Sequence, residues 1–309
     1  MNRSIYLQLR KAALFSIIFV VLVFLTDAVY ISLIFPKSGL IAQIQEYEKV
    51  KYNISVLILG DSHPNQGIDR SYFPEAFVFA IEGGKYAEIY YILRAELENN
   101  EQISFLALQI DPHSIDGKKP QPNFYPVRYW KNYLSWQELK VETQKSIPRL
   151  YLEYLFAFLG NARDVINLLS NYALIEPNRY SKFSEDPLRE STAQKRVESS
   201  ITNDAIEKKD ILPLLQMVEF AKQKKLAVVL IKYPLSPEYL MALNKKQFNS
   251  SKYYQFINKS LQEYGDVYTY DFQRSYNSSY FSDSDHLNYE GAELFSNSLR
   301  KAFLEQEIS

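Results

Sequence analysis

Two short segments, far apart in the chain, carry the residue types of serine-based acyl chemistry. The first is Gly60-Asp61-Ser62-His63, which directly follows the apolar, β-favouring run Ser55–Leu59. A buried strand that ends in a tight turn can present a serine nucleophile. The second segment supplies Asp283 and His286. Because a serine hydroxyl needs a base to take its proton and a carboxylate to orient that base, we predict a catalytic triad of Ser62, His286 and Asp283.

Asp285 is an alternative partner for His286. Its direct adjacency makes a hydrogen bond from the ring N–H to the Asp285 carboxylate awkward, so we favour Asp283.

The chain has only three histidines, His63, His113 and His286, and each lies in a motif or at the end of a predicted strand. An Asp-x-His string is also found among metal ligands. No second ligand cluster accompanies it in the sequence, so we predict neither a metal nor a cofactor.

Gly60-Asp61-Ser62 and Asp283-x-x-His286 resemble the first and last motif blocks of the SGNH, or GDSL, hydrolases and acyltransferases, in the order found in that family. The resemblance covers about residues 54–114 and 226–303. It implies a flavodoxin-like α/β fold with a doubly wound parallel sheet, and acyl transfer through the serine. It also implies that the oxyanion is bound by the serine N–H, by a glycine after the second strand and by an asparagine after the third.

Two of these three oxyanion donors have candidates in the chain. They are Ser62 itself and either Gly83 or Gly84, which follow the second predicted strand. The third position differs from the family, which commonly has Gly-x-Asn-Asp there. In this chain the corresponding stretch, residues 109–113, reads Gln-Ile-Asp-Pro-His, and its last residue is His113. The third donor is then His113, or Asn65 in the serine turn, or the oxyanion site is incomplete.

Strands alternate with helices along most of the chain. The predicted strands are residues 55–59, 76–81, 103–110, 227–231 and 267–272, and the predicted helices include residues 86–97, 211–223 and 289–305. This alternation predicts a doubly wound parallel sheet, in which ligands bind beyond the carboxyl ends of the strands. The motifs named above lie at such ends or directly before the last helix.

The N-terminal region predicts a membrane anchor. Residues Ala12–Phe35 are mostly apolar, carry one charge at Asp27 and follow the basic residues Arg3, Arg10 and Lys11. At about 1.5 Å per residue such a helix spans a hydrocarbon core of about 30 Å, and the basic flank places the N-terminus in the cytoplasm and the remaining chain outside. A cleaved signal peptide is the alternative, but the run is long for one and no Ala-x-Ala-like site follows. Asp27 either reaches the membrane interface or contacts a membrane partner.

We divide the chain into a cytoplasmic N-terminus and anchor over residues 1–36, a helical connector over residues 37–53 and an SGNH-like domain over residues 54–309. Between residues 117 and 202 the alternation stops, which predicts a helical insertion rich in aromatic residues. These side chains, Trp130 and Trp136 among them, either stack on sugar rings or, as we favour, pack in an ordinary core. The polar stretch 181–203 is predicted to be a mobile loop.

Composition excludes several classes of function. With 35 basic and 36 acidic residues among 309 and a formal net charge of -1, the chain offers no basic stripe for nucleic acid. It contains no cysteine, which excludes disulfides and thiolate chemistry but does not fix the cellular compartment.

Three functions fit these observations. The resemblance favours an extracytoplasmic O-acyltransferase, in the first place an O-acetyltransferase, that modifies a cell-envelope or secreted polysaccharide through an acyl-Ser62 intermediate. Membrane-anchored members of the family O-acetylate alginate and other exopolysaccharides or transfer D-alanine to teichoic acids, which implies a glycan acceptor and a membrane-bound O-acyltransferase partner. The second function is an esterase that deacetylates such polymers, and the third is a non-catalytic adaptor. The anchor favours the transferase, and the missing asparagine favours the adaptor.

Overall fold

The computed structural model describes residues 3–34, 39–98, 100–114, 127–160, 181–201, 207–265 and 267–307. The chain divides into two units, one formed by residues 1–42 and 124–174 and the other by residues 43–123 and 175–309. The second unit holds the sheet and every predicted site residue, and the first holds the long apolar helix.

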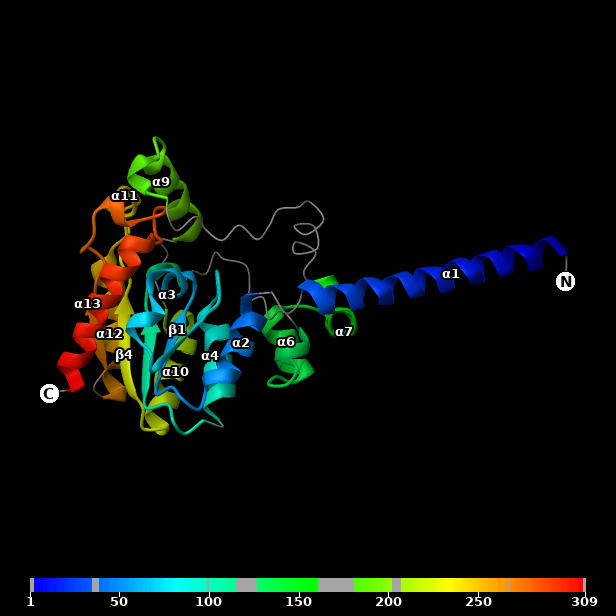
Figure 1. The fold of residues 1–309 in the computed structure, drawn as a ribbon, viewed down its shortest axis with the longest axis horizontal. Coiled ribbons are helices and arrows are strands. Elements are labelled where there is room, and N and C mark those ends of the chain that lie inside the picture. Colours follow the sequence, from blue (N-terminus) through cyan, green and yellow to red (C-terminus); the bar gives the residue numbers. More distant parts are fainter. Residues whose placement is uncertain are drawn as a thin grey trace. The chain divides into compact units, whose positions relative to one another are not determined.

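The sheet has five parallel strands. In spatial order they are β2 (Ala76–Ala80), β1 (Val56–Gly60), β3 (Phe105–Gln109), β4 (Ala227–Lys232) and β5 (Tyr268–Asp271) (Figure 1). The predicted α/β fold with a parallel sheet is confirmed, and the order 2-1-3-4-5 is the flavodoxin-like one. In that topology the strand order reverses beside β1, so the carboxyl ends of β1 and β3 border a natural ligand site.

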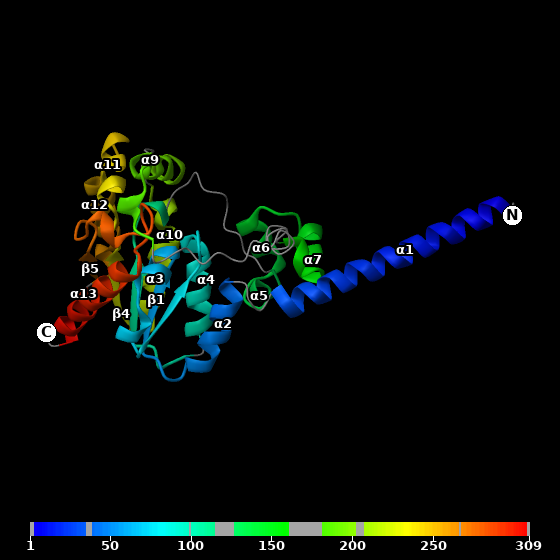
Figure 2. The ribbon, with the colours of Figure 1, turned by 45° about the horizontal axis from the view of Figure 1, so that its top comes forward.

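Helices cover both faces of the sheet, which explains why its central strands read as continuous apolar runs. In both views the strands lie between helix α13 (Tyr289–Glu307) on one side and helices α4 (Tyr86–Leu97) and α2 (Gly39–Val50) on the other (Figures 1 and 2). Ile58 and Val229 share a core cluster with Phe295 of α13. Helix α4 also packs against helix α10 (Leu212–Gln223).

Helix α2, in the region predicted as a connector, protects an edge of the sheet. The side-chain amide of Gln43 donates a hydrogen bond to the carbonyl of Ala80 (2.6 Å) and accepts one from the N–H of Ala80 (2.8 Å). Tyr47 adds ring contacts with Phe77 and Phe79. The amide of Gln43 thus takes the place of a further strand residue beside β2 and leaves less of this edge open to pairing.

The prediction of a mobile loop over residues 181–203 is wrong for the described residues there, because Arg189–Ser200 forms helix α9. Ala193 and Val197 are buried in the core cluster. The Lys246 ammonium donates hydrogen bonds to carbonyl oxygens at the C-terminal end of α9, where a cation complements the helix dipole. The buried stripe of α9 is narrow and the rest of its surface is polar, which is why the sequence has the composition of a loop.

The first unit combines the N-terminal helix with short helices of the predicted insertion. Its elements are α1 (Arg3–Val29), the π-helical turn η1 (Tyr30–Ile34), α5 (Val127–Trp130), α6 (Trp136–Thr143), α7 (Ile147–Leu155) and the 3-10 turn η5 (Ala157–Gly160). Among the described residues, one helix is long and apolar enough to cross a membrane, and it covers the 29 residues Ile5–Leu33.

The aromatic residues of the insertion include clear core positions. Trp130 is fully buried, so its ring has no face available to a sugar. Trp136 is half-buried and stacks on Tyr151 with ring centroids 4.1 Å apart. Three further aromatic residues of the insertion, Tyr125, Tyr172 and Tyr180, lie outside the described residues.

Candidate active site

Ser62 lies directly beyond the carboxyl end of β1, as predicted, and begins the short helix α3 (Ser62–Gly67). The carboxylate of Asp61 caps this helix by accepting a hydrogen bond from the N–H of His63 (3.0 Å). Position 60 requires glycine because a Cβ there would overlap the side chain of Gln109. The close packing holds the sharp turn from strand to helix and fixes the Ser62 hydroxyl at the strand end.

The structure brings together the three residues predicted as a triad. The Nε2 atom of His286 lies 2.8 Å from the Ser62 hydroxyl oxygen, and its Nδ1 atom lies 2.8 Å from Oδ2 of Asp283. Oδ1 of Asp283 accepts hydrogen bonds from the N–H groups of His286 (2.8 Å) and Asp285 (3.0 Å). Both carboxylate oxygens of Asp283 are therefore engaged, and the imidazole is held with one nitrogen toward the serine and the other toward the carboxylate.

Asp285 occupies a different position. Its Oδ1 atom is 3.9 Å from Nδ1 of His286, beyond hydrogen-bond distance, while its Oδ2 atom accepts a hydrogen bond from Nε of Arg196 on α9 (3.0 Å). Burial alone would raise the pKa of Asp285, but the charges of His286 and Arg196 outweigh burial and lower it. Asp285 is thus a buried carboxylate held by α9 rather than the ring partner of His286.

A second group of polar residues is buried directly behind the serine turn. Asp61 faces both other histidines: its Oδ1 atom is 3.0 Å from Nδ1 of His63, and its Oδ2 atom is 2.8 Å from Nε2 of His113. The rings of His63 and His113 stack with centroids 4.5 Å apart, and the His63 ring lies 5.3 Å from that of His286. All three histidines of the chain therefore meet at one place.

Gln109 and Asp111 complete this buried group. The Gln109 side chain accepts a hydrogen bond from the N–H of Asp61 (2.9 Å) and donates one to Oδ2 of Asp111 (2.9 Å). Oδ1 of Asp111 in turn accepts a hydrogen bond from the N–H of Tyr233 after β4 (3.2 Å). These contacts join the ends of β1, β3 and β4, so the serine turn is supported from two neighbouring strands.

Burial and the charges within this group shift the pKa values of its members. Burial would lower the pKa of His63, but the adjacent Asp61 carboxylate outweighs burial and raises that pKa to about 9. Burial raises the pKa of Asp111 to about 7, although His63 opposes the shift. Asp61 is also buried, yet His113 and His63 hold the pKa of its carboxylate well below the usual value. The group therefore retains protons that the unfolded chain loses near neutral pH.

We expect the free energy of unfolding to fall as pH rises from about 4 to about 9. Between pH 3.8 and 7 the folded protein keeps the Asp111 proton that the unfolded chain loses, and between pH 6.5 and 9 it keeps the His63 proton. The His63 contribution is fully present below pH 6.5, and its loss amounts to up to about 3 kcal/mol by pH 9. Urea unfolding of the full chain at several pH values measures this slope.

His63→Gln removes the His63 part of the slope between pH 7 and 9 because the titrating ring is lost. It also moves the Asp111 part to higher pH, because His63 no longer opposes the effect of burial on the Asp111 pKa. The low pKa values of Asp61 and Asp285 affect stability only in more acidic solution, where these carboxylates become protonated. Unfolding free energies of the wild-type chain that rise steadily from pH 5 to 9 would contradict the protonation states described above.

The predicted oxyanion donors are not equivalent in the structure. The N–H of Gly84 donates a hydrogen bond to the carbonyl of Ile81 (2.7 Å) and so closes the turn after β2, which leaves Gly83 as the glycine candidate. Gly83 has φ = +66°, a conformation that suits glycine. The turn lies beside the serine turn because Gly60 pairs with Ala80 in the register of β1 and β2.

The side-chain candidates also differ. Nε2 of His113 is engaged with Asp61 inside the buried group, and the ring is 5% exposed, so this arrangement does not support His113 as the third donor. Asn65 lies on α3 one turn after Ser62 and is half-buried. Of the two predicted side chains, Asn65 is therefore the better candidate.

Within the part of the chain that the structure describes, two groups of residues have the spacing of metal ligands. Possible ligand atoms of Asp61, His63 and His113 lie within 4.8 Å of one another, and the same holds for Asp283, Asp285 and His286. The first group is a cluster that the sequence did not reveal. In both groups, however, imidazole nitrogens already face carboxylate oxygens at hydrogen-bond distance, which is the chemistry of charge-assisted pairs. The absence of a metal stays a prediction.

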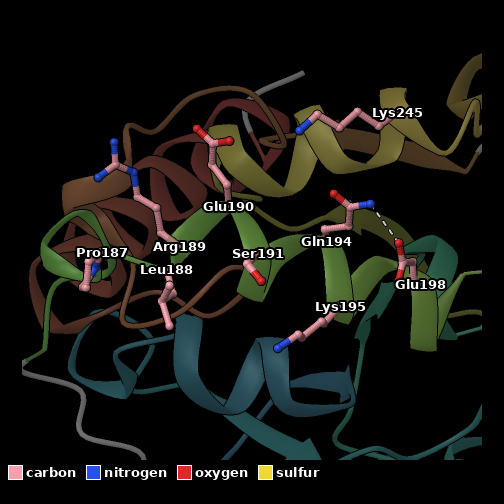
Figure 3. Close-up of a pocket in the computed structure, with 9 residues that line it drawn as sticks. All are labelled: Pro187, Leu188, Arg189, Glu190, Ser191, Gln194, Lys195, Glu198 and Lys245. Atoms are coloured by element: carbon pink, nitrogen blue, oxygen red, sulfur yellow. Dashed lines mark hydrogen bonds between the residues drawn. The ribbon is translucent and has the colours of Figure 1, made fainter.

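A polar hollow of about 620 Å³ lies along the exposed side of α9 (Figure 3). Its walls carry both signs of charge, and within it Gln194 donates a hydrogen bond to Glu198 (2.8 Å). The lining residues are Pro187, Leu188, Arg189, Glu190, Ser191, Gln194, Lys195, Glu198 and Lys245. The same helix carries Arg196, which contacts Asp285 beside His286 but is not among the residues that line the hollow.

Sequence reasoning missed three features of the site: Arg196, Gln109 and the contacts of Asp61 with two histidines. Arg196 lies in a stretch that reads as a loop, and its partner is 89 residues away. Gln109 ends an apolar strand, where a lone amide followed by Asp111 is the only signal in the sequence that a buried polar group begins there.

Comparisons with known proteins add little to this geometry. A family model that carries no descriptive name matches residues 172–307. No curated protein matches the chain. Among solved structures, the chain is similar to the crystal structure of a "putative acylhydrolase" from Bacteroides fragilis NCTC 9343, with 12% identity and a TM-score of 0.44 over 86% of this chain and 97% of that chain.

Proposed function

We propose that this protein is a serine-dependent acyl-transfer enzyme in which Ser62 is the nucleophile, His286 the general base and Asp283 the residue that orients the base. One observation carries the proposal: a continuous line of contacts runs from the Ser62 hydroxyl through both nitrogens of His286 to Asp283, with 2.8 Å at each step. Such an arrangement makes a neutral serine reactive without a cofactor.

The reaction follows from these positions. Nε2 of His286 takes the hydroxyl proton while the Ser62 oxygen attacks the acyl carbonyl, and the oxyanion is bound by the N–H groups of Ser62 and Gly83 and by the Asn65 side chain. The imidazolium then protonates the leaving alcohol, the tetrahedral intermediate collapses and acyl-Ser62 remains. In the second half, His286 deprotonates the incoming alcohol or water, which attacks the acyl-enzyme and regenerates Ser62.

We further propose an extracytoplasmic O-acyltransferase that acts on a cell-envelope or secreted polysaccharide. Helix Ile5–Leu33 supports attachment to a membrane, and the basic residues Arg3, Arg10 and Lys11 before its apolar run support an outward-facing enzyme unit. A membrane-bound O-acyltransferase would then supply the acyl group. An esterase differs only in the acceptor of the second step, and a non-catalytic adaptor would not use Ser62 at all.

The hollow on α9 is our candidate for the acceptor site. Sugar hydroxyls are bound by polar and charged side chains of the kind that line it, and the hollow belongs to the helix whose Arg196, on another side, contacts Asp285 beside His286. The burial of Trp130 removes one of the two tryptophans that the aromatic insertion would offer to a sugar. Lys195 and Gln194 of the hollow are exposed and suitable for substitution.

With an activated acetyl ester as donor and an envelope-type oligosaccharide as acceptor, the purified full chain should form acyl-sugar that mass spectrometry detects. A bound hydroxyl competes with water because positioning raises its effective concentration. Lys195→Ala should lower the yield of acyl-sugar but leave phenol release unchanged, because the first half-reaction does not need the acceptor. Lys224→Ala, outside the hollow, is the matched control. Free acid as the sole product with every acceptor would favour the esterase.

A further inference from the structure

Helix α7 (Ile147–Leu155) carries its apolar residues on the outside. Leu150 and Glu153 are buried, whereas Tyr151, Leu152, Tyr154 and Leu155 are between 37% and 53% exposed. At 3.6 residues per turn these four side chains cover a continuous arc of about 160°. We call them the α7 apolar face. A surface helix in water normally shows the opposite arrangement, with leucines inside and carboxylates outside.

Glu153 is buried inside this unit and is stabilised there by two cations. Its carboxylate accepts hydrogen bonds from Lys145 (2.8 Å) and Arg149 (3.0 Å), so the buried charge is fully paired. The paired charge holds α7 in its present rotation, with Glu153 inside and Leu152 and Leu155 outside. The apolar face is thus a stable property of the helix.

Helix α7 is tied to the C-terminal end of the apolar helix within the same unit. Arg128 forms an ion pair with Asp27 of α1 (3.2 Å) and donates hydrogen bonds to the carbonyls of Tyr154 and Leu155 at the end of α7. The ring of Phe156, the residue after α7, makes an edge contact with Phe24 of α1 at 5.4 Å. Asp27 therefore has a partner in its own chain, which neither sequence interpretation of this residue foresaw.

These contacts set the depth of α7 relative to a membrane crossed by α1. The 29 residues Ile5–Leu33 are about 43 Å long as a helix, which is about 13 Å more than the hydrocarbon core. Arg10 and Lys11 place the start of the apolar span at Ala12, so most of this excess lies at the cytoplasmic end, and about 30 Å of helix counted from Ala12 ends near Ile31. Asp27 then lies about one turn, and Phe24 about two turns, inside the outer boundary between hydrocarbon and water. Helix α7 is attached at that level, where tyrosine and tryptophan side chains are enriched.

We propose that the α7 apolar face lies in the lipid interface beside the membrane exit of α1, so that this unit rests on the bilayer as an amphipathic module. The proposal depends on the membrane span proposed above. Lipid is favoured over a protein partner because Phe156, directly after α7, contacts Phe24, which is itself 59% exposed and would face lipid in a span. Trp136, stacked on Tyr151, adds a further interfacial ring.

The chain has no cysteine, so single cysteines can be introduced and spin-labelled without background. We would place one label at Leu152→Cys or Leu155→Cys in the full chain, reconstituted in liposomes of phosphatidylcholine and phosphatidylglycerol. Leu188→Cys, 66% exposed in the other unit, is the aqueous control, and Val20→Cys in the middle of α1 is the lipid control. All four positions are exposed, so labelling should not disturb the core. Collision rates with oxygen and with a water-soluble nickel chelate are measured by electron paramagnetic resonance.

Labels at Leu152 and Leu155 should show an oxygen-to-nickel collision ratio several-fold higher than the Leu188 label and below that of the Val20 label. A ratio equal to that of Leu188 would overturn the proposal, and so would shielding from both reagents, which would indicate a protein partner on this face. A Val20 label in water would instead refute the membrane span itself, so the two failures are distinguishable.

Discussion

Replacement of Ser62 by alanine should reduce ester cleavage and acyl transfer by about 10⁴- to 10⁶-fold. The Ser62 hydroxyl is the atom that attacks the acyl carbon in the proposed reaction, and nothing else at its position is nucleophilic. The backbone N–H of residue 62 remains in Ser62→Ala, so residual activity reports the oxyanion donors and binding alone. Phenol release from an activated acetyl ester and detection of acyl-enzyme by intact-protein mass spectrometry measure the effect.

The substitution should leave the fold intact. Among the described residues, the Ser62 hydroxyl is hydrogen-bonded to His286 alone, and alanine is readily accepted in a helix. The free energy of unfolding should therefore change by less than about 1 kcal/mol. Ser298→Ala is a suitable control for the loss of a serine hydroxyl, because Ser298 is half-buried and its partners, the carbonyl of Leu294 and the side chain of Tyr276, do not belong to the triad. Full activity in Ser62→Ala would support the adaptor and refute the enzyme.

Asp283→Asn should lower the rate of ester cleavage by about 10⁴-fold, and Asp285→Asn should be at least about tenfold less damaging. Asp283 is the carboxylate within hydrogen-bond distance of Nδ1 of His286, so its amide substitute would favour the wrong tautomer of the ring. Asp285 is 3.9 Å away and its charge is already balanced by Arg196. The ratio of the two rates tests the assignment directly.

The pair of substitutions is well matched because both remove one carboxylate charge from the same segment. Asp285→Asn leaves Arg196 without its ion-pair partner, but the Arg196 side chain is 45% exposed and remains solvated, so the fold should tolerate the change. If Asp285→Asn proved the more damaging substitution while both variants stayed folded, Asp285 would have to approach the ring in the active enzyme and the role proposed for Asp283 would be wrong.

The local sequence determined where helices and strands form, and it indicated which strand ends carry the residues of the candidate site. Apolar runs of strand length, helical periodicity and the residues after each run are short-range signals, and they predicted helix Tyr86–Leu97 to the residue and strand β1 to within one. The motifs and their positions relative to the predicted strands and helices were sufficient to predict Ser62 as the nucleophile and Asp283 and His286 as its partners. The apolar N-terminal helix was equally readable, because length and composition are sufficient for that prediction.

Tertiary structure decided which side chains meet. Asp283 and Asp285 have nearly the same sequence context, and only the loop conformation brings the first to Nδ1 of His286 and the second to Arg196. The burial of His113 against Asp61 likewise depends on β3 lying beside β1, 52 residues apart in sequence. Helix α9 looked like a loop, and the outward face of α7 looked like part of a core. The contacts of Arg196 with Asp285, of His113 with Asp61 and of Lys246 with α9 join residues distant in sequence, and short-range patterns contain no information about such contacts. The contacts of Asp283 with His286 and of Glu153 with Lys145 and Arg149 are local, but they depend on a loop conformation and a helix rotation that the rest of the fold fixes.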